Sequence, residues 1–506
     1  MALRGRFTTN AGFLLAAIGS VVGMGSIWRF PYIAYANGGG AFLIPYFIAL
    51  LTAGIPLLLL EYGLGHKMHA SSPLAFAKIS LKVEWLGWWM PLFVTFGILF
   101  YYQVVIGWCG NFLVYALSTA WGADSEGFFL NTFLGLTSAP EKVGGLRWPI
   151  VASTAAAWFV TWAVTFQEVH RGIERTLRVF MPVLLVTTLI LVGWGLTLPG
   201  ASEGLKYYLT PRWDKLLDVK VWLAAYSQIF FSFSLAFGVM IAYASYLPRR
   251  ADLVQNAWIT SLSTWLYSLV AGVAVFSVLG YLSVSKGLPI EYVVKSGPTL
   301  AFVVFPEAIS NLPWLREAFG VCFFFALMLA GLASAVAMVE TFVVSVQDKF
   351  GWPRKTVVTV LVLVGMVGSL LYTTGSGLHW LVIVDRYLNQ YGLVLAGLLE
   401  CLVIGFGLKA GVVRDHINRH TRLPMDPRWD FMVKFLTPAL LLVMLVRSLW
   451  AEIAHGFGSY RTLTVLAMGG GWLLLTLLAA WWLARRPWDP QRLRTEHQPA
   501  EDELFR

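Results

Sequence analysis

Charged residues are scarce in this chain of 506 residues, because Asp, Glu, Lys and Arg make up only 13% of it while 58% is hydrophobic. The mean hydropathy is +0.69. This composition excludes a set of ordinary soluble domains and is typical of an integral membrane protein. Cysteine is also scarce: the three cysteines fall in apolar stretches, without disulfide or metal-ligand spacing. No H-E-x-x-H or similar catalytic motif occurs, so we do not expect an enzyme.

Long apolar runs dominate the chain. Since about 20 apolar residues cross a bilayer as a helix, the sequence predicts twelve spans, centred near residues 22, 55, 104, 158, 186, 235, 270, 332, 364, 394, 440 and 472. Lys and Arg gather in the loops on the side of the amino terminus, which explains the net charge of +10 without a nucleic-acid partner. We expect a multi-pass protein in the lipid bilayer of the inner (plasma) membrane, with both termini cytoplasmic and an uncleaved first helix.

Two of the predicted spans are interrupted, one at Gly23 to Gly25 and the other at Ser234 to Gly238. A glycine inside a helix costs about 1 kcal/mol relative to alanine. Close helix packing on a G-x-x-x-G face, here Gly19 and Gly23, is one explanation. The other is a pair of unwound segments, because corresponding breaks in two halves of a chain indicate an inverted-repeat transporter with a site near the midplane.

The expected fold class is therefore all-α and integral to the membrane. It has twelve transmembrane helices, in a five-plus-five inverted repeat with broken helices 1 and 6, plus two additional helices. The corresponding organisation is 1–200 for the first repeat, 201–408 for the second, 409–485 for spans 11 and 12, and 486–506 for a cytoplasmic tail.

An arginine follows the first break. An unpaired charge at the depth of Arg29 costs ~2.5 kcal/mol or more, so it needs a partner or water. Asp385 in the tenth predicted span is the natural partner. Snorkelling of Arg29 to the outer surface is the alternative.

The stretch "GSIWRFPYIAYANGGGAFLIPY" resembles the first-helix signature of the neurotransmitter:sodium symporter family, in particular its bacterial amino-acid members with the leucine-transporter-type fold. The resemblance extends from Arg4 to about Gly407 through "FYYQVVIGW", "YSQIFFSFSLAFGVMIAYASY", "AGVAVFSVLGY" and "LAGLASAV". It implies a sodium-coupled secondary active importer of a small neutral amino acid that works by alternating access.

The resemblance also implies a substrate site. The substrate carboxylate would meet the amides of Val21, Gly23, Met24 and Gly25 and the hydroxyl of Tyr102. Amine-carrying relatives have aspartate in place of Gly23, so the glycine here implies a substrate with its own carboxylate. The pocket wall would consist of Val21, Ile98, Phe231, Ser234, Ala236, Phe237, Ser334 and Met338. Val21, Ile98 and Ala236 are larger than in roomy members, so we expect a small pocket.

Gates are implied on both sides of that pocket. Tyr102 and Phe231 would close over the substrate, and Arg29 with Asp385 would form the outer gate. On the inner side, Arg4 and Asp348 would form a latch.

The ion sites implied by the family lack some of their usual side-chain ligands in this sequence. One sodium site would use Val21, Ser26, Ser232 and Thr264, of which Ser26 and Thr264 replace asparagines. The other would use the carbonyls of Gly19, Val22 and Ala330 with the hydroxyl of Ser334, while Ala333 replaces a usual hydroxyl or carboxylate ligand. One or two sodium ions are therefore expected. Chloride would be held by Tyr46, Gln228, Ser232 and Ser268.

Alternatives to sodium-coupled amino-acid import stay open at this point. Glu61 or Glu340 could carry a proton, although structural pairing is another explanation for both. The chain could also be a sodium-independent carrier of a related zwitterion, such as a β- or γ-amino acid, or a transport-dead sensor.

Overall fold

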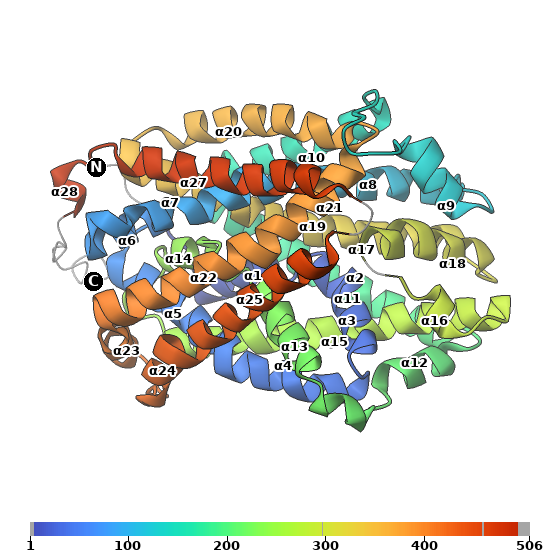
Figure 1. The fold of residues 1–506 in the computed structure, drawn as a ribbon, viewed down its shortest axis with the longest axis horizontal. Helices are drawn as coiled ribbons and strands as arrows, with labels where there is room; N and C mark the ends of the chain where they lie inside the picture. The colour runs from blue at the N-terminus through green and yellow to red at the C-terminus, as the bar shows by residue number, and fades with distance from the viewer. Residues whose placement is uncertain (1–4, 296, 458–459, 494–506) are drawn as a thin grey trace.

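The computed structural model describes residues 5–295, 297–457 and 460–493. Helices make up almost all of this part of the chain, and most of them run along the long axis of the molecule (Figure 1). At one end lie α6 (Ser72–Ile79), α23 (Ala410–Asn418) and α28 (Pro490–Leu493). At the other end lie α9 (Ser125–Gly127), α16 (Ile290–Val293) and α18 (Phe305–Asn311). The helical content and the long apolar helices confirm an all-α, multi-pass membrane protein.

Ten helices in the described residues are long and apolar enough to cross a membrane. They are Gly40–Met68 (α4, α5), Leu81–Ala116 (α7, α8), Trp148–Thr165 (α10), His170–Leu196 (α11), Leu253–Lys286 (α15), Arg316–Phe350 (α19), Arg354–Thr373 (α20), Gly377–Asn418 (α21 to α23), Arg428–Ala454 (α24, α25) and Thr462–Ala484 (α26, α27). The number rises to eleven if one bent pair of shorter helices, Asn10–Val21 with Gly25–Ala36, is counted as a single span. The predicted span near residue 235 is divided into pieces of 14 and 6 residues, each too short to cross alone.

The first predicted break is confirmed. Helix α1 (Asn10–Val21) is capped by Thr9, whose hydroxyl accepts a hydrogen bond from the amide of Gly12, 3.0 Å away. It ends before Gly23, and the chain resumes as α2 (Gly25–Trp28) and α3 (Phe30–Ala36). The two halves are bent by 54°. The glycines of the opening stretch therefore end a helix as well as pack against neighbours.

The second break lies between α13 (Val219–Ser232) and α14 (Val239–Ala244). Three residues here have positive φ: Ser234 (+49°), Ala236 (+61°) and Gly238 (+73°). Only glycine adopts this region without cost, and an L-residue loses roughly 1–2 kcal/mol there. A contact must hold the segment in place, and the amide of Ala236 supplies one by donating to Glu61 Oε1 over 2.7 Å.

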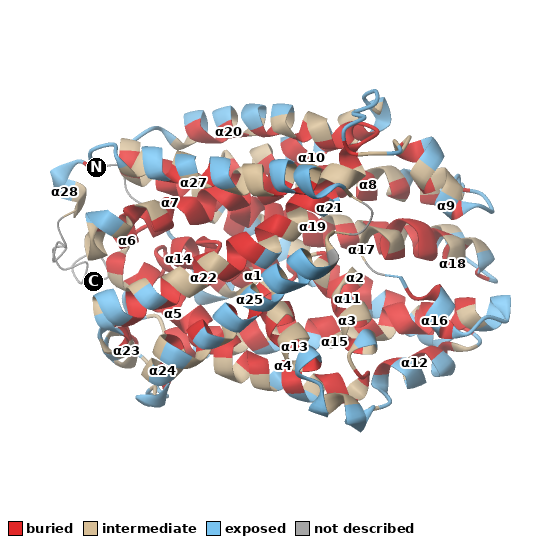
Figure 2. Ribbon diagram, viewed as in Figure 1, coloured by how far each residue is buried: buried red, intermediate tan, exposed pale blue. Residues whose placement is uncertain are grey.

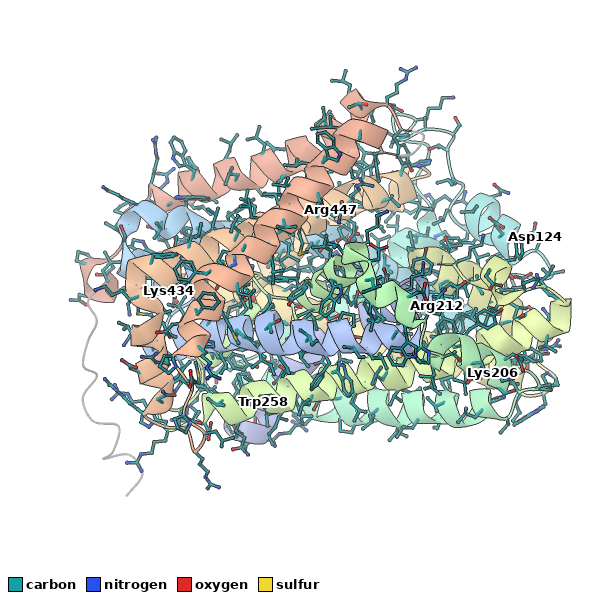
Figure 3. All side chains as sticks on the ribbon, turned by 60° about the horizontal axis from the view of Figure 1, so that its bottom comes forward. Asp124, Lys206, Arg212, Trp258, Lys434 and Arg447 are labelled. Carbon is teal, nitrogen blue, oxygen red and sulfur yellow. The ribbon has the colours of Figure 1, made fainter. Side chains whose placement is uncertain are left out.

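Buried residues gather around these two breaks (Figure 2). Helices α8 (Leu99–Ala116) and α19 pack along each other beside α1. The last two spans, by contrast, are the least buried of the ten (Figure 2), and apolar side chains such as Trp450 and Trp482 are exposed on them. Arg447 lies exposed on α25 (Thr437–His455), and Lys434 is half-buried (Figure 3). The unwound segments thus lie in the core, and the carboxyl-terminal helices lie at its periphery.

The chain after the last span folds back onto the end of α19. Trp488 is buried, and the ammonium group of Lys349 lies 4.3 Å from the centre of its ring. Arg492 donates to the carbonyl oxygens of Gln347 and Asp348. The predicted tail therefore begins with a docked segment.

Candidate substrate and ion site

Backbone groups are freed where α1 ends. In the part of the chain that the structure describes, the amides of Gly23, Met24 and Gly25 donate to no backbone carbonyl. Val21 is the last residue of α1, so its amide belongs to the helix and is not available. Three of the four predicted amides can therefore meet an anionic group.

Two hydroxyl groups face the same point from other helices. A Cβ atom on residue 23 would lie 3.0 Å from Ser334 Oγ, on α19, and 3.1 Å from the hydroxyl oxygen of Tyr102, on α8. The Tyr102 hydroxyl is also close to the amide of Met24. Both hydroxyls therefore approach the backbone at Gly23 so closely that a side chain on residue 23 would crowd them. A carboxylate suits this place, because it accepts hydrogen bonds from several donors at once.

The aromatic side of the site is formed by Phe231, at the end of α13. A Cβ on residue 25 would lie 2.5 Å from Phe231 Cε1, so the ring rests directly on Gly25. The guanidinium of Arg29 lies over the same ring, 4.0 Å from its centre. Gly25, Phe231 and Arg29 therefore form one stack above the first break.

The other predicted pocket residues are buried, but they do not all face one point. Phe237 packs edge-on against Phe93, with ring centroids 6.0 Å apart. The Cβ of Ala236 lies 3.6 Å from the position that a Cβ on Gly397 would take, so this side chain faces α22 (Leu393–Leu402). The predicted narrowing of the pocket by Ala236 thus has no support in its orientation. The other wall residues, Val21, Ile98, Ser234 and Met338, are buried in the core.

Ser334 lies among three carbonyl groups. Its hydroxyl oxygen is 3.4 Å from the carbonyl oxygen of Gly19 and 3.3 Å from those of Ser20 and Ala330. A hydroxyl donates one hydrogen, so it cannot satisfy all three, and such a cluster of oxygens suits a cation. The structure brings together Gly19, Ala330 and Ser334 as predicted. It adds Ser20, which sequence reasoning missed, and no described hydrogen bond joins Val22 to the cluster through its carbonyl.

Ala333 lies beside Gly19: its Cβ is 3.5 Å from where a Cβ on Gly19 would be. It contributes no side-chain oxygen at this place. The cluster therefore relies on carbonyl groups and one hydroxyl.

A second polar cluster joins α4 (Leu43–Ala49), α13 and α15. Gln228 Nε2 donates to Ser232 Oγ over 2.8 Å, and the hydroxyl of Tyr46 lies near Ser232 and Ser268. Two buried atoms here, the Tyr46 hydroxyl and Gln228 Oε1, have no hydrogen-bond partner in the described chain, and Ser26 Oγ on α2 is another buried atom without one. Unpaired buried polar atoms need an explanation, and an ion pair of sodium and chloride would supply partners of both kinds.

Two of the predicted ion ligands use their hydrogens within their own helix. Thr264 donates to the carbonyl of Thr260 over 2.8 Å, and Ser268 donates to that of Thr264 over 3.0 Å. Their oxygens keep lone pairs, which suits a cation at Thr264. Ser268, however, would have to turn its hydroxyl to donate to an anion.

The outer gate differs from the expectation. No ion pair joins Arg29 and Asp385 in the described residues. Asp385 Oδ1 accepts hydrogen bonds from the Tyr101 hydroxyl, 2.6 Å away, and from Asn389 Nδ2, 2.7 Å away. Arg29 is close enough to Asp385 to interact electrostatically, but it lies on Phe231. Both of these donors bond to the same carboxylate oxygen, Oδ1.

On the inner side, Arg4 of the predicted latch lies outside the described residues. Asp348 accepts a hydrogen bond from the amide of Ser71 over 2.8 Å. Glu340 is paired instead of free: Tyr246 donates to it over 2.6 Å, and the guanidinium of Arg354 contacts both of its oxygens. Structural pairing, one of the two explanations for Glu340, is therefore the observed arrangement.

Comparison with known proteins identifies the family of this chain. The model of the sodium:neurotransmitter symporter family matches residues 4–125 and 119–481. An uncharacterized sodium-dependent transporter of Methanocaldococcus jannaschii is 39% identical over 463 residues, covering 92% of this chain and 94% of that protein. The sodium- and chloride-dependent GABA transporter 2 of Rattus norvegicus is 30% identical over 550 residues, covering 99% and 90%. The sodium- and chloride-dependent glycine transporter 1 of Xenopus laevis is 30% identical over 502 residues, covering 88% and 78%. The chain therefore belongs to the sodium:neurotransmitter symporter family and is a membrane transporter, not an enzyme.

Proposed function

We propose that this transporter imports a small neutral amino acid together with sodium, and that chloride takes part. The observation that carries the substrate class is the convergence at Gly23 of the hydroxyls of Tyr102 and Ser334 with amides that donate to no backbone carbonyl. This set of donors suits a carboxylate, and position 23 is a glycine and not an aspartate that could serve as a counter-ion for an amine. Relatives named for glycine and GABA transport support a small amino-acid-like substrate.

The ion requirements are proposed from the two polar clusters. The carbonyls around Ser334 would hold one sodium ion, with Gly19, Ser20 and Ala330 as the other ligands. The orphaned oxygens near Ser26, Tyr46 and Gln228 would hold a second sodium ion next to chloride. Relatives named as sodium- and chloride-dependent support this pairing.

The architecture that we propose completes the described helices. The pieces α13 and α14 together make a twelfth, broken span, and residues 1–200 and 201–408 form the two inverted repeats, followed by spans 11 and 12 in 409–485. Both termini face the cytoplasm, as the distribution of Lys and Arg predicts. During transport the site would open alternately to the two sides of the membrane. The stack of Phe231 and Arg29 would close it on the outer side, and the pair of Glu340 and Arg354 on the inner side.

A thermal-shift screen of the purified protein tests the substrate and the ions together. Glycine, alanine and GABA are compared with leucine and tryptophan, each with sodium replaced by potassium and chloride replaced by gluconate. A ligand at 100 times its Kd stabilises the folded protein by about 2.7 kcal/mol. We expect stabilisation by a small amino acid only when sodium is present, and none by ethylamine, which lacks the carboxylate. Stronger stabilisation by tryptophan or ethylamine would contradict the proposed substrate class.

A further inference from the structure

Three side chains that follow Asp385 along the chain converge on one carboxylate. Tyr387 donates a hydrogen bond to Glu452 Oε1 over 2.6 Å, and Tyr391 donates one to Glu452 Oε2 over 2.5 Å. Arg386 Nη2 lies 3.5 Å from the same Oε2. One acidic side chain of α25 therefore holds two hydroxyl groups and one guanidinium group of the segment that carries Asp385.

These contacts form a largely buried joint between helices. Tyr387 and Tyr391 are 6% and 7% exposed, and the side chain of Glu452 is 16% exposed. Together with Ile383 and Val465, the two tyrosines form a hydrophobic cluster of their own, beside the main core. Hydrogen bonds to a charged group contribute most where water has little access, and the loss of the carboxylate would leave two buried hydroxyls unpaired. The joint is therefore stronger than an ordinary ion pair on the surface.

The last span supports the joint from another side. The ring of Tyr387 lies against Gly469, where a Cβ atom would collide with it, and its Cε1 lies 3.6 Å from where a Cβ on Gly470 would be. The guanidinium of Arg386 lies over the ring of Phe457, 4.3 Å from its centre. Both of the last two spans thus contact the same short stretch of chain.

The carboxylate of Asp385 and the ring of Tyr387 lie on opposite sides of α21 (Gly377–Tyr387). Successive residues of a helix are about 100° apart, so residues two positions apart lie on nearly opposite sides. On one side, Asp385 accepts hydrogen bonds from Tyr101 on α8 and from Asn389. On the other side, Tyr387 is bonded to Glu452. A rotation of α21 about its axis would break the second contact and move the Asp385 carboxylate.

We propose that Glu452 is a positioning residue of the outer gate: by holding α21 on its far side, it sets where the carboxylate of Asp385 lies. The gate part of this inference rests on the proposed function, in which the outer side of the site closes at Arg29 and Phe231. Asp385 and Arg29 interact electrostatically without forming an ion pair in the part of the chain that the structure describes. The rotation of α21 therefore decides how near they come, and the last two spans act on the site through this helix.

The first test is a double-mutant cycle of melting temperatures on the full-length protein without substrate. Glu452→Ala removes the carboxylate, and Asp385→Asn weakens the contacts on the opposite side of α21. If Glu452 positions Asp385, the melting temperature should fall less on Glu452→Ala in the Asp385→Asn background than in the wild type, because coupled residues do not act additively. Glu307→Ala is the matched control, since this acidic residue on α18 pairs with Lys286; its effect should be the same in both backgrounds.

The second test is the rate at which radiolabelled glycine leaves the protein in sodium chloride. Glu452→Ala should change this rate by about three- to tenfold, the order expected for residues of one hydrogen-bond network, and in the same direction as Asp385→Asn. It should add nothing in the Asp385→Asn background. Glu452→Gln can still accept a hydrogen bond from one tyrosine, so it should restore part of the wild-type rate. A residue that only stabilises the fold would lower the melting temperature and leave the rate unchanged.

Two results would overturn the proposal: additive effects of Glu452→Ala and Asp385→Asn on the melting temperature, or a glycine release rate in Glu452→Ala equal to that of the wild type. If Glu452→Ala does not fold, the same measurements on Tyr387→Phe decide the question, because this variant loses one hydroxyl and keeps the ring on Gly469. The melting cycle needs no substrate. Coupled melting temperatures in a protein that no amino acid stabilises would refute the proposed substrate while supporting the placement of Asp385 by Glu452.

Discussion

Replacing Ser334 with alanine tests the proposed sodium site most directly. The hydroxyl oxygen lies 3.3–3.4 Å from the carbonyl oxygens of Gly19, Ser20 and Ala330, so a sodium ion at this cluster would lose one ligand out of four. A hydrogen-bond-type contact to a charged group contributes about 1.5–3 kcal/mol. The sodium Kd should therefore rise by about 10- to 150-fold. The three carbonyls stay in place, because they belong to the backbone of α1 and α19.

The measurement is the melting temperature as a function of sodium concentration, with potassium added to keep the ionic strength constant. Stabilisation follows the ratio of sodium to its Kd, so the curve of Ser334→Ala should shift to higher sodium. Ser345→Ala is the matched control: its hydroxyl is buried on the same helix and donates to the carbonyl of Thr341 over 2.7 Å. If the two variants respond to sodium identically, the cluster around Ser334 is not a sodium site.

Three further changes probe the substrate and chloride sites. Tyr102→Phe removes one donor to the carboxylate and should weaken substrate binding by about 1.5–3 kcal/mol; an unchanged Kd in calorimetry would exclude Tyr102 from the site. Gly25→Ala places a Cβ 2.5 Å from the Phe231 ring, which must then move. We expect radiolabelled uptake to fall at least tenfold while the protein still folds, and wild-type uptake would show that the stack does not border the substrate. Tyr46→Phe removes an unpaired buried hydroxyl. Replacing chloride with gluconate should destabilise the wild type but not this variant, and equal responses would place chloride elsewhere.

Sequence reasoning predicted the helix breaks because they follow from local chemistry. Glycines at positions 19, 23 and 25 weaken the helix within the stretch where α1 ends, whatever packs around them. The second break carries less local signal: Ser234 and Ala236 adopt positive φ although neither is glycine. There the prediction rested on the interruption of the apolar span and on its correspondence with the first break, and the contact from Glu61 explains why the strain is tolerated.

The parts of the site that sequence did not predict depend on how helices are rotated against each other. The carbonyl of Ser20 joins the oxygen cluster around Ser334 only because α19 brings Ser334 beside it. Arg29 lies on Phe231, while Tyr101 and Asn389 donate to Asp385. Such contacts between side chains of different helices leave no trace in residue spacing.

The docked segment after the last span has a practical consequence for handling the protein. Trp488 and Arg492 rest on the same end of α19 that carries Asp348, one of the two residues of the predicted inner latch. An affinity tag or a fluorescent protein fused before Arg492 would remove these contacts, whereas one fused after residue 506 would leave them intact. Apparent changes in transport that follow a truncation at this end would then report on the movement of α19 and not on the removed residues themselves.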